Sequence, residues 1–500
     1  MPYPFIGYGK VTALEEKLSK EVSNLSAEVA ALKARLDYTL RQLYGSKSEK
    51  TDLGQLPLGL AGVEEEPSPR EEPPSEPAAG KARPSRKGHS RAKLHETLEE
   101  RTVYVDPEHV RAAPDDFREI GRETSEQLDI EPPKLVKVTT IRRKFVRKDD
   151  PAGKPAIAPM PPRPIDKGLP TARLPAWVVV SKYCDHAPLY RQEKAFKRLG
   201  CAVSRKTISD WVESVEFWLA GIVELMKCQL LAGNYIQADE TPVKYMDEDI
   251  ARKRCGEGYL WGISAPGEDI VFHWATSRAH AVATSLLGGY AGLLQCDGYQ
   301  AYEKVDATRI ACMAHVRRYF EKAQSEDPAF ATFVMHAIRN LYRAEAKARK
   351  AGLSPKLCAR LRQSESAMTF RLLGKAIAKR QGRYLPKSAM GKAVPYALGQ
   401  WGAMSRYLEY GQAEIDNNLM ENAIRPTAVG KKNWMFVGHP KAGSRSAVIY
   451  SIVGSCERRG INPFEYIHDV LERIPSMKAS EQYKLTLQHW AKYRTVKEES

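Results

Sequence analysis

The chain has 500 residues, of which 43% are hydrophobic, and it carries a formal net charge of +16. This length predicts several domains, and the apolar fraction suffices for at least one large core. The basic excess favours a polyanionic partner. No run of eighteen apolar residues occurs and the N-terminus lacks the apolar core of a signal peptide, so the sequence predicts neither a membrane span nor export.

The eight cysteines are scattered along the chain, and no Cys-x-x-Cys pair occurs. So few cysteines in so long a chain argue against a disulfide framework and are typical of a reducing compartment. We therefore expect a cytoplasmic protein.

Residues 12–44 are predicted to form one long helix. Its apolar residues recur with alternating steps of four and three, interrupted only by Thr39, at Leu18, Val22, Leu25, Val29, Leu32, Leu36 and Leu43. This heptad stripe is typical of a coiled coil, although a helix packed on its own domain gives the same pattern. A linker rich in Pro, Glu, Gly and Ser follows over 52–80, so no partner face adjoins the helix in sequence. Self-association into a homodimer is therefore the favoured interpretation.

A candidate DNA-contacting region lies between residues 189 and 211. A helix over about 189–199, a turn at Gly200 and a second helix capped by Ser204 have the cadence of a helix-turn-helix. Arg205 and Lys206 open the second helix and would contact DNA in that case. A purely structural helical pair explains the pattern equally well.

The following region has the strand order of a known fold class. Strands are predicted over 235–239, 258–264, 269–275, 293–296 and 309–314, with a helix over 279–287 before the fourth strand. The first strand ends at Asp239, because Thr241 and Pro242 are expected to break it, and the fourth ends at Asp297. This order is that of the α/β ribonuclease-H-like fold, in which these two strand ends lie side by side.

After residue 315 the sheet pattern gives way to helical, basic sequence. Fifteen Lys or Arg residues lie between 339 and 392, against Glu345 and Glu365 as the only acids, which favours a contact with nucleic acid over a solvated surface. A short helix is then predicted from about residue 417 to Pro426. Glu421 lies one turn inside it and is expected to face the sheet, while Asp416 is the rival third acid and suits the N-cap.

Three converging carboxylates require a physical reason, because like charges repel and burial is costly. Two Mg²⁺ ions about 4 Å apart supply one, and they stabilise the attacking and leaving oxygens of a phosphodiester substitution. Mn²⁺ is expected to substitute. Taken singly, each Asp is explained as a turn former and the Glu as a solvated residue. Their joint placement predicts that Asp239, Asp297 and Glu421 are metal ligands and catalytic residues.

Several segments resemble the insertion sequence 66 family of bacterial transposases, and the likeness covers nearly the whole chain. They are LRQLYGSKSEK (40–50), QADETPV (237–243), CDGYQAY (296–302), CMAHVRRYF (312–320) and DNNLMENAIRPTAVGKKNW (416–434). The resemblance implies that Asp239, Asp297 and Glu421 match an Asp-Asp-Glu triad and that the region between the last two acids is a helical insertion. It also implies small accessory proteins from the same element.

The chain departs from this family in one respect. Such proteins usually carry a zinc-binding Cys cluster after the linker, but no cysteine precedes Cys184 here, so no structural zinc is expected. Cys312 and His315 have the spacing of half a zinc site, yet no second pair lies nearby in sequence. A buried Cys and a polar His near the active site is the favoured interpretation.

Basic and aromatic residues near the triad are candidate DNA contacts. Arg317 and Arg318 follow the His, and Arg425 follows the Glu on its helix. Lys431, Lys432 and Trp434 would hold and stack a DNA end, although Trp434 fits a core position as well.

The sequence thus predicts a DNA transposase associated with the nucleoid, which binds element ends and target DNA and cuts and joins strands. A transposase-derived DNA-binding protein without catalysis and a nuclease of the same fold remain as alternatives. The expected division is a coiled-coil helix (1–50), a linker (51–95), a degenerate zinc-finger-like region (96–150), a helical region (165–230), the core's first part (231–325), a basic helical insertion (326–405), the core's second part with closing helices (406–475) and a tail (476–500).

Overall fold

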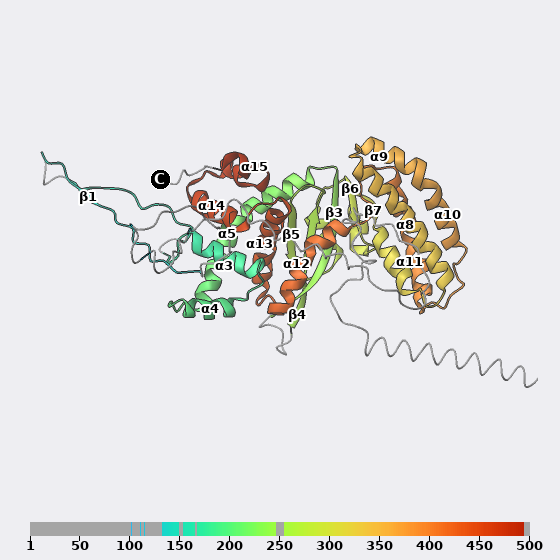
Figure 1. Cartoon of the computed structure of the whole chain (residues 1–500), viewed down its shortest axis with the longest axis horizontal. Coiled ribbons are helices and arrows are strands. Elements are labelled where there is room, and N and C mark those ends of the chain that lie inside the picture. The colour runs from blue at the N-terminus through green and yellow to red at the C-terminus, as the bar shows by residue number, and fades with distance from the viewer. Residues whose placement is uncertain are drawn as a thin grey trace, which may run out of the picture. The chain divides into compact units, whose positions relative to one another are not determined.

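The computed structural model describes residues 133–149, 154–165, 168–246 and 255–494, together with Thr102, Arg111 and Asp115 (Figure 1). The predicted coiled coil, the linker and most of the region 96–150 lie outside these described residues. All eight cysteines are free. Within the described ranges, no helix combines the length and the apolarity that a membrane crossing requires.

Between residues 133 and 231, within the described ranges, a pair of short strands and three helices precede the main sheet. They are β1 (Lys144–Phe145), β2 (Ala156–Ile157), α3 (Arg173–Tyr183), α4 (Leu189–Arg198) and α5 (Arg205–Leu231). Ser204 caps α5 by accepting the Thr207 N–H at 3.1 Å, and Gly200 adopts a positive φ of 84° in the turn before it. Both features match the sequence prediction. Val203, Ile208 and Trp211 are buried near the junction of α4 and α5, and they belong to the same large hydrophobic core as the sheet.

The mixed five-stranded sheet has the order β5-β4-β3-β6-β7. Its strands are β3 (Tyr235–Met246), β4 (Cys255–Ser264), β5 (Ile270–Ala275), β6 (Leu293–Cys296) and β7 (Thr308–Ala311), with α6 (His280–Leu286) and η3 (Gln300–Lys304) in the connections. The β3–β4 and β4–β5 pairs are antiparallel, whereas the β3–β6 and β6–β7 pairs are parallel. The chain is therefore a mixed α/β protein, as the sequence predicts.

The helical region after the sheet packs at the β7 edge. Its elements are α7 (Met313–Lys322), α8 (Pro328–Lys350), α9 (Pro355–Leu361), the π-helical segment η4 (Arg362–Ser366), α10 (Ala367–Ala378), α11 (Ala389–Ser405) and η5 (Arg406–Leu408). α11 contacts both α7 and β7, and these helices share one hydrophobic core with residues 407–415 (Figure 1). This core brings the chain back to the sheet just before Glu421.

The last elements complete a second and larger core. They are α12 (Asn418–Trp434), α13 (Pro440–Arg458), α14 (Pro463–Arg473), η6 (Ile474–Ser476), η7 (Ala479–Leu485) and α15 (Leu487–Tyr493). α13 packs on β5 and α5, and Gly460, with a φ of 65°, follows its end. Asn462 caps α14 by accepting the Phe464 N–H at 2.9 Å. Leu485 and Trp490 are buried, so the predicted tail packs onto the core up to residue 494.

Two predicted breaks are wrong, and both fall at prolines. β3 continues through Pro242 to Met246. The Pro242 carbonyl accepts a hydrogen bond from the Lys431 ammonium at 2.7 Å, so the backbone N and C=O of the proline point away from β4. The missing N–H therefore removes no hydrogen bond between β3 and β4. α12 likewise continues through Pro426 to Trp434. The carbonyl that loses its N–H donor to the proline belongs to the exposed residue Asn422, and packing of the buried face of α12 outweighs the local penalty.

The fifth predicted strand is too long at its C-terminal end. β7 stops at Ala311, and Cys312 is already the N-cap of α7. The apolar run that suggested a strand continues because the first turn of α7 is buried as well, at Met313 and Ala314. Periodicity alone does not separate a buried strand from a buried helical turn.

Candidate active site

Asp239 and Asp297 extend from neighbouring strands at matching positions. In the parallel β3–β6 pair, Gln237 is the partner of Gln295, and each aspartate follows its glutamine by two residues. Side chains two residues apart on a strand share one face of the sheet. The amide of Gln237 donates to Gln295 Oε1 at 3.1 Å, which confirms that this face is common to both strands. The two aspartates therefore lie side by side, although Asp239 is in the middle of its strand rather than at its end.

Glu421 reaches the same face of the sheet from α12. Asp239 is the antiparallel partner of Gly262, so both residues face the same side. The Met420 side chain lies directly against Gly262, and a Cβ added there would meet Met420 Cε at 2.2 Å. This close approach seats the first turn of α12 over the aspartates. A larger residue at position 262 would have to displace the flexible end of the Met420 side chain.

The convergence of acids changes the protonation of Asp239. Burial, together with the negative charges of Glu240, Asp297 and Glu421, raises the pKa of Asp239 to about 8. The Glu240 N–H, which donates to Asp239 Oδ1 at 3.0 Å, only partly offsets this effect. Asp297 in turn accepts the Tyr299 N–H at 2.9 Å. Without a cation the site holds a proton at neutral pH.

Two side chains of α7 contact Glu421. Arg318 donates to both carboxylate oxygens, and His315 Nδ1 lies 3.8 Å from Oε1. Burial and the Arg318 charge lower the pKa of His315. Asn417 holds the start of α12 against α7 and β3. Its N–H donates to Cys312 Sγ at 3.2 Å, and its side-chain amide donates to the Ala238 carbonyl at 2.9 Å.

Asp416, the rival third acid, has other partners. Its Oδ2 accepts the Tyr342 hydroxyl of α8 at 2.7 Å, and its Oδ1 accepts the Asn418 N–H at 3.0 Å. The N-cap of α12 is Asn417 rather than Asp416, which corrects the prediction by one residue. Asp416 therefore braces the helix start, while Glu421 is the acid near the aspartates.

The opposite face of the sheet carries a polar cluster that sequence analysis missed. Glu240 is the partner of Trp261, and Trp261 packs edge-on against Tyr302. The Tyr302 hydroxyl donates to Glu240 Oε2 at 2.7 Å, and Arg278 Nε donates to Oε1 at 3.0 Å. Burial raises the pKa of Glu240 despite these partners. Glu240, the second acid in QADETPV, was the sequence signal for this cluster. That its side chain lies on the face opposite to Asp239 is evident only once both residues are known to lie in one strand.

The candidate DNA-binding residues fall into separate groups. Arg205 and Lys206 are exposed at the start of α5, and Arg425 and Lys432 are exposed on α12. Arg317 and Arg318 lie on α7, where Arg318 is engaged by Glu421.

Two of these candidates have structural contacts. Lys431 Nζ donates to Thr241 Oγ1 at 2.9 Å and to the Pro242 carbonyl. Trp434 is partly buried and packs against the larger core, and its Nε1 is close to where a Gly430 Cβ would lie. Their roles toward DNA stay predictions.

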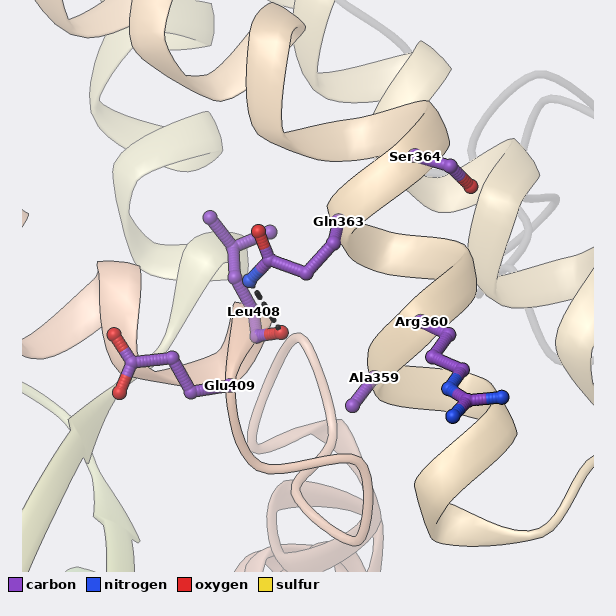
Figure 2. Close-up of a pocket in the computed structure, with 6 residues that line it drawn as sticks. All are labelled: Ala359, Arg360, Gln363, Ser364, Leu408 and Glu409. Atoms are coloured by element: carbon purple, nitrogen blue, oxygen red, sulfur yellow. Dashed lines mark hydrogen bonds between the residues drawn. The ribbon is translucent and has the colours of Figure 1, made fainter.

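A surface pocket of about 490 Å³ lies away from the acids, on the helical insertion. Figure 2 shows its lining residues, which come from α9, η4, the end of η5 and the residue after it, with the Gln363 amide donating to the Leu408 carbonyl at 3.2 Å. It contains one acid, Glu409, and no aspartate of the site. The acids, rather than this hollow, define the candidate active site.

Comparison with family models yields three matches. Residues 167–445 match the model described as "Transposase IS66 family", and residues 451–486 match the "IS66 C-terminal element". Residues 31–103 match "Transposase C of IS166 homeodomain". The last match identifies a DNA-binding, homeodomain-like region that overlaps the predicted linker and lies outside the described residues.

Three proteins of Sinorhizobium fredii (strain NBRC 101917 / NGR234) are similar to the chain, and all carry the name "uncharacterized protein". y4jD is 30% identical over 95% of the chain and 97% of its own length. y4qI is 31% identical over 71% of the chain and 68% of its own length. y4hP is 27% identical over 92% of the chain and 89% of its own length. The first similarity extends over both chains nearly end to end.

Proposed function

The chain belongs to the IS66 family of transposases, and from that premise we propose that Asp239, Asp297 and Glu421 form the catalytic triad of DNA strand cleavage and strand transfer. The observation that carries this proposal is the matched register of the two aspartates beneath the first turn of α12. The strand order β5-β4-β3-β6-β7 supports a ribonuclease-H-like core built from 231–325 and 406–475, with 326–405 inserted.

The donor set of the triad fits divalent magnesium. All its ligands are carboxylate oxygens, which Mg²⁺ and Mn²⁺ prefer. Burial and three neighbouring negative charges raise the pKa of Asp239, and a bound cation would balance those charges. When bound, two such ions would polarise the scissile phosphate and lower the pKa of the attacking water.

The chain's own residues have defined tasks in this proposal. Asp239 gives up its proton before the site is loaded, and Glu421 leaves Arg318. Arg318 is then available for a phosphate oxygen. Water first cuts each end to leave a 3′ hydroxyl, and that hydroxyl next attacks target DNA at the same site. No Tyr or Ser nucleophile is required.

The assembly around this chemistry is also part of the proposal. Two element ends have to be held together, which a homodimer through the predicted coiled coil over residues 12–44 would achieve. The exposed Arg205, Lys206, Arg425 and Lys432 would contact DNA, and small accessory proteins of the element would join the complex. The nucleoid in the cytoplasm is the expected place of action.

The test is cleavage and joining of a supercoiled plasmid that carries the element's two ends, with Mg²⁺ or Mn²⁺. Asp239→Asn, Asp297→Asn and Glu421→Gln are each expected to lose about 1,000-fold or more in rate, which is about 4 kcal/mol of transition-state stabilisation. Each should still bind the ends. Glu303→Gln, at an exposed acid of η3, is the matched control and should stay active.

Three outcomes decide between functions. Cutting and joining that depend on all three acids support the proposal. Cutting without joining would identify a nuclease instead. End binding by the wild type without any metal-dependent product, even with accessory proteins present, would identify a DNA-binding protein derived from a transposase.

A further inference from the structure

Glu421 also belongs to a second group of ligand atoms, formed with Cys312 and His315. Cys312 is the N-cap of α7, His315 lies one turn further on that helix, and Glu421 comes from α12. One ligand atom from each of the three residues lies within 4.8 Å of the others. More than one hundred residues separate the Cys-x-x-His pair from the glutamate, so the complete group exists only in the folded chain.

The imidazole in this group lacks a hydrogen-bond partner. His315 Nδ1 is buried and makes no hydrogen bond within the described residues, and it faces Glu421 Oε1 at 3.8 Å. A buried ring nitrogen without a partner is costly, and such groups in native proteins call for an explanation. A metal ion between the imidazole and the carboxylate would supply that missing partner.

The three ligand types select the class of metal. A thiolate, an imidazole and a carboxylate match Zn²⁺ and related borderline-soft ions, whereas Mg²⁺ accepts only hard oxygen ligands. Three protein ligands also leave a fourth tetrahedral position for water. Metal–ligand distances of about 2.0–2.3 Å put the ligand atoms of such a site roughly 3.3–3.7 Å apart. The group would therefore close by about 1 Å, which rotation of the His315 and Glu421 side chains can provide.

We propose that Cys312, His315 and Glu421 bind a zinc-class ion and that this site competes with the catalytic triad for Glu421. Glu421 is the ligand that the two groups share, so an ion held by Cys312 and His315 would draw its carboxylate away from the pair of aspartates. Arg318 has to leave the carboxylate in both cases, since it contacts both oxygens. The binding site stands on its own geometry, whereas the inhibition of cleavage rests on the proposed function.

Binding is tested with Co²⁺ as the probe, on the full chain. Coordination by Cys312 is expected to give a sulfur-to-cobalt charge-transfer band with a stoichiometry of one ion per chain, which Zn²⁺ abolishes by displacement. Cys312→Ser should remove the band. Cys228→Ser and Cys255→Ser, at exposed cysteines, and Cys358→Ser, at a buried cysteine of the insertion, are matched controls that should retain it.

The outcomes of this test are distinct. No band in the wild type, or a band that persists in Cys312→Ser, overturns the site. His315→Ala provides a second reading, because it leaves the thiol and should weaken Co²⁺ binding at least 10-fold. Circular dichroism and thermal unfolding of each variant show whether a lost band reflects lost folding. If Cys312→Ser is unfolded, the Co²⁺ affinity of His315→Ala is the deciding measurement. An affinity of His315→Ala equal to that of the wild type overturns the site.

Competition is tested by adding Zn²⁺ to the plasmid cleavage reaction at fixed Mg²⁺, with every rate divided by the same variant's zinc-free rate. The wild type is expected to lose activity as the site fills, and Cys312→Ser or His315→Ala should need at least 10 times more Zn²⁺ for the same loss. Equal sensitivity of wild type and variants overturns the competition. A wild type that never cleaves refutes the proposed function, and the cobalt band still decides the metal site.

Discussion

Asp239 and Asp297 stand at equivalent positions of two parallel strands, each two residues beyond the paired glutamines Gln237 and Gln295. This register forces two carboxylates onto the same face of the sheet, and α12 adds a third above them. Crowding of this kind stores electrostatic free energy in the metal-free protein. Its consequences can be measured without any assay of DNA cleavage.

The first prediction concerns the stability of the metal-free protein against pH. The pKa of Asp239 is about 8 in the folded chain but close to 3.8 when it is unfolded. Between these values the folded state holds a proton that the unfolded state has lost, so rising pH lowers the free energy of unfolding. Asp239→Asn removes this dependence and should be the more stable protein above pH 8, by at least about 1 kcal/mol, which is roughly 1–2 °C in melting temperature for a chain of this size.

Thermal unfolding with a chelator between pH 5 and 9 measures this difference. Asp306→Asn, at an exposed aspartate, is the control and should follow the wild-type curve. The prediction fails if the wild type and Asp239→Asn keep the same difference in melting temperature across the whole range.

The second prediction concerns Glu240 on the opposite face. Its side chain is 1% exposed, and Arg278 and Tyr302 are its polar partners. Arg278→Met leaves a buried carboxylate with one hydrogen-bond donor and should cost about 1–3 kcal/mol of stability. Adding Glu240→Gln should recover part of the loss, because the uncompensated charge is gone. Urea unfolding measures both, with the exposed Arg371→Met as a control; a double variant no more stable than Arg278→Met alone would contradict this account.

The sequence anticipates those features that local chemistry determines. Leu293–Cys296 is the fourth strand and Asp297 follows it, because a short apolar run that ends in Asp-Gly leaves few alternatives. Ser204 caps α5 as expected, since its side chain satisfies a free backbone N–H group.

The sequence fails where packing between distant segments outweighs local preference. Pro242 remains in a strand because Lys431 binds its carbonyl, and Pro426 remains in a helix because the buried face of α12 continues past it. The nearness of Cys312 to Glu421 could not be predicted either, because it depends on how α7 and α12 meet. The contact of Lys431 with Pro242 and the approach of Cys312 to Glu421 both join segments that are far apart in sequence, so no pattern within one segment indicates them.

The third prediction concerns Arg362, one of the basic residues expected to favour DNA. It is buried, with side-chain exposure of 3%, and forms a two-pronged ion pair with Glu345 at 2.8 and 2.7 Å. It also donates to the carbonyls of Tyr407, Tyr410 and Ala413, which lie in the segment that precedes α12. Arg362→Ala should therefore destabilise the protein by about 3–5 kcal/mol, because the Glu345 charge stays buried.

The matched control is the exposed Lys347–Glu365 pair. With side chains 64% and 39% exposed, this pair is screened by water, and Lys347→Ala should cost at most about 1 kcal/mol. Chemical unfolding measures both variants. Similar losses of stability in Arg362→Ala and Lys347→Ala would show that burial does not determine how much each ion pair contributes.

The last prediction separates two adjacent lysines of α12 that the sequence treats alike. Lys431 ties the helix to β3 through Thr241 and Pro242, and burial lowers its pKa, whereas Lys432 is exposed. Lys431→Met should cost about 1–3 kcal/mol of stability and leave the salt dependence of DNA binding unchanged. Lys432→Met should leave stability unchanged but weaken binding to element ends, and the slope of log affinity against log salt should fall by about 1. Thermal unfolding and fluorescence anisotropy at several salt concentrations measure both effects. If Lys431→Met instead lowers the salt slope while folding normally, its ammonium leaves β3 for a phosphate in the complex, and the contact with Pro242 is a resting state of the free protein.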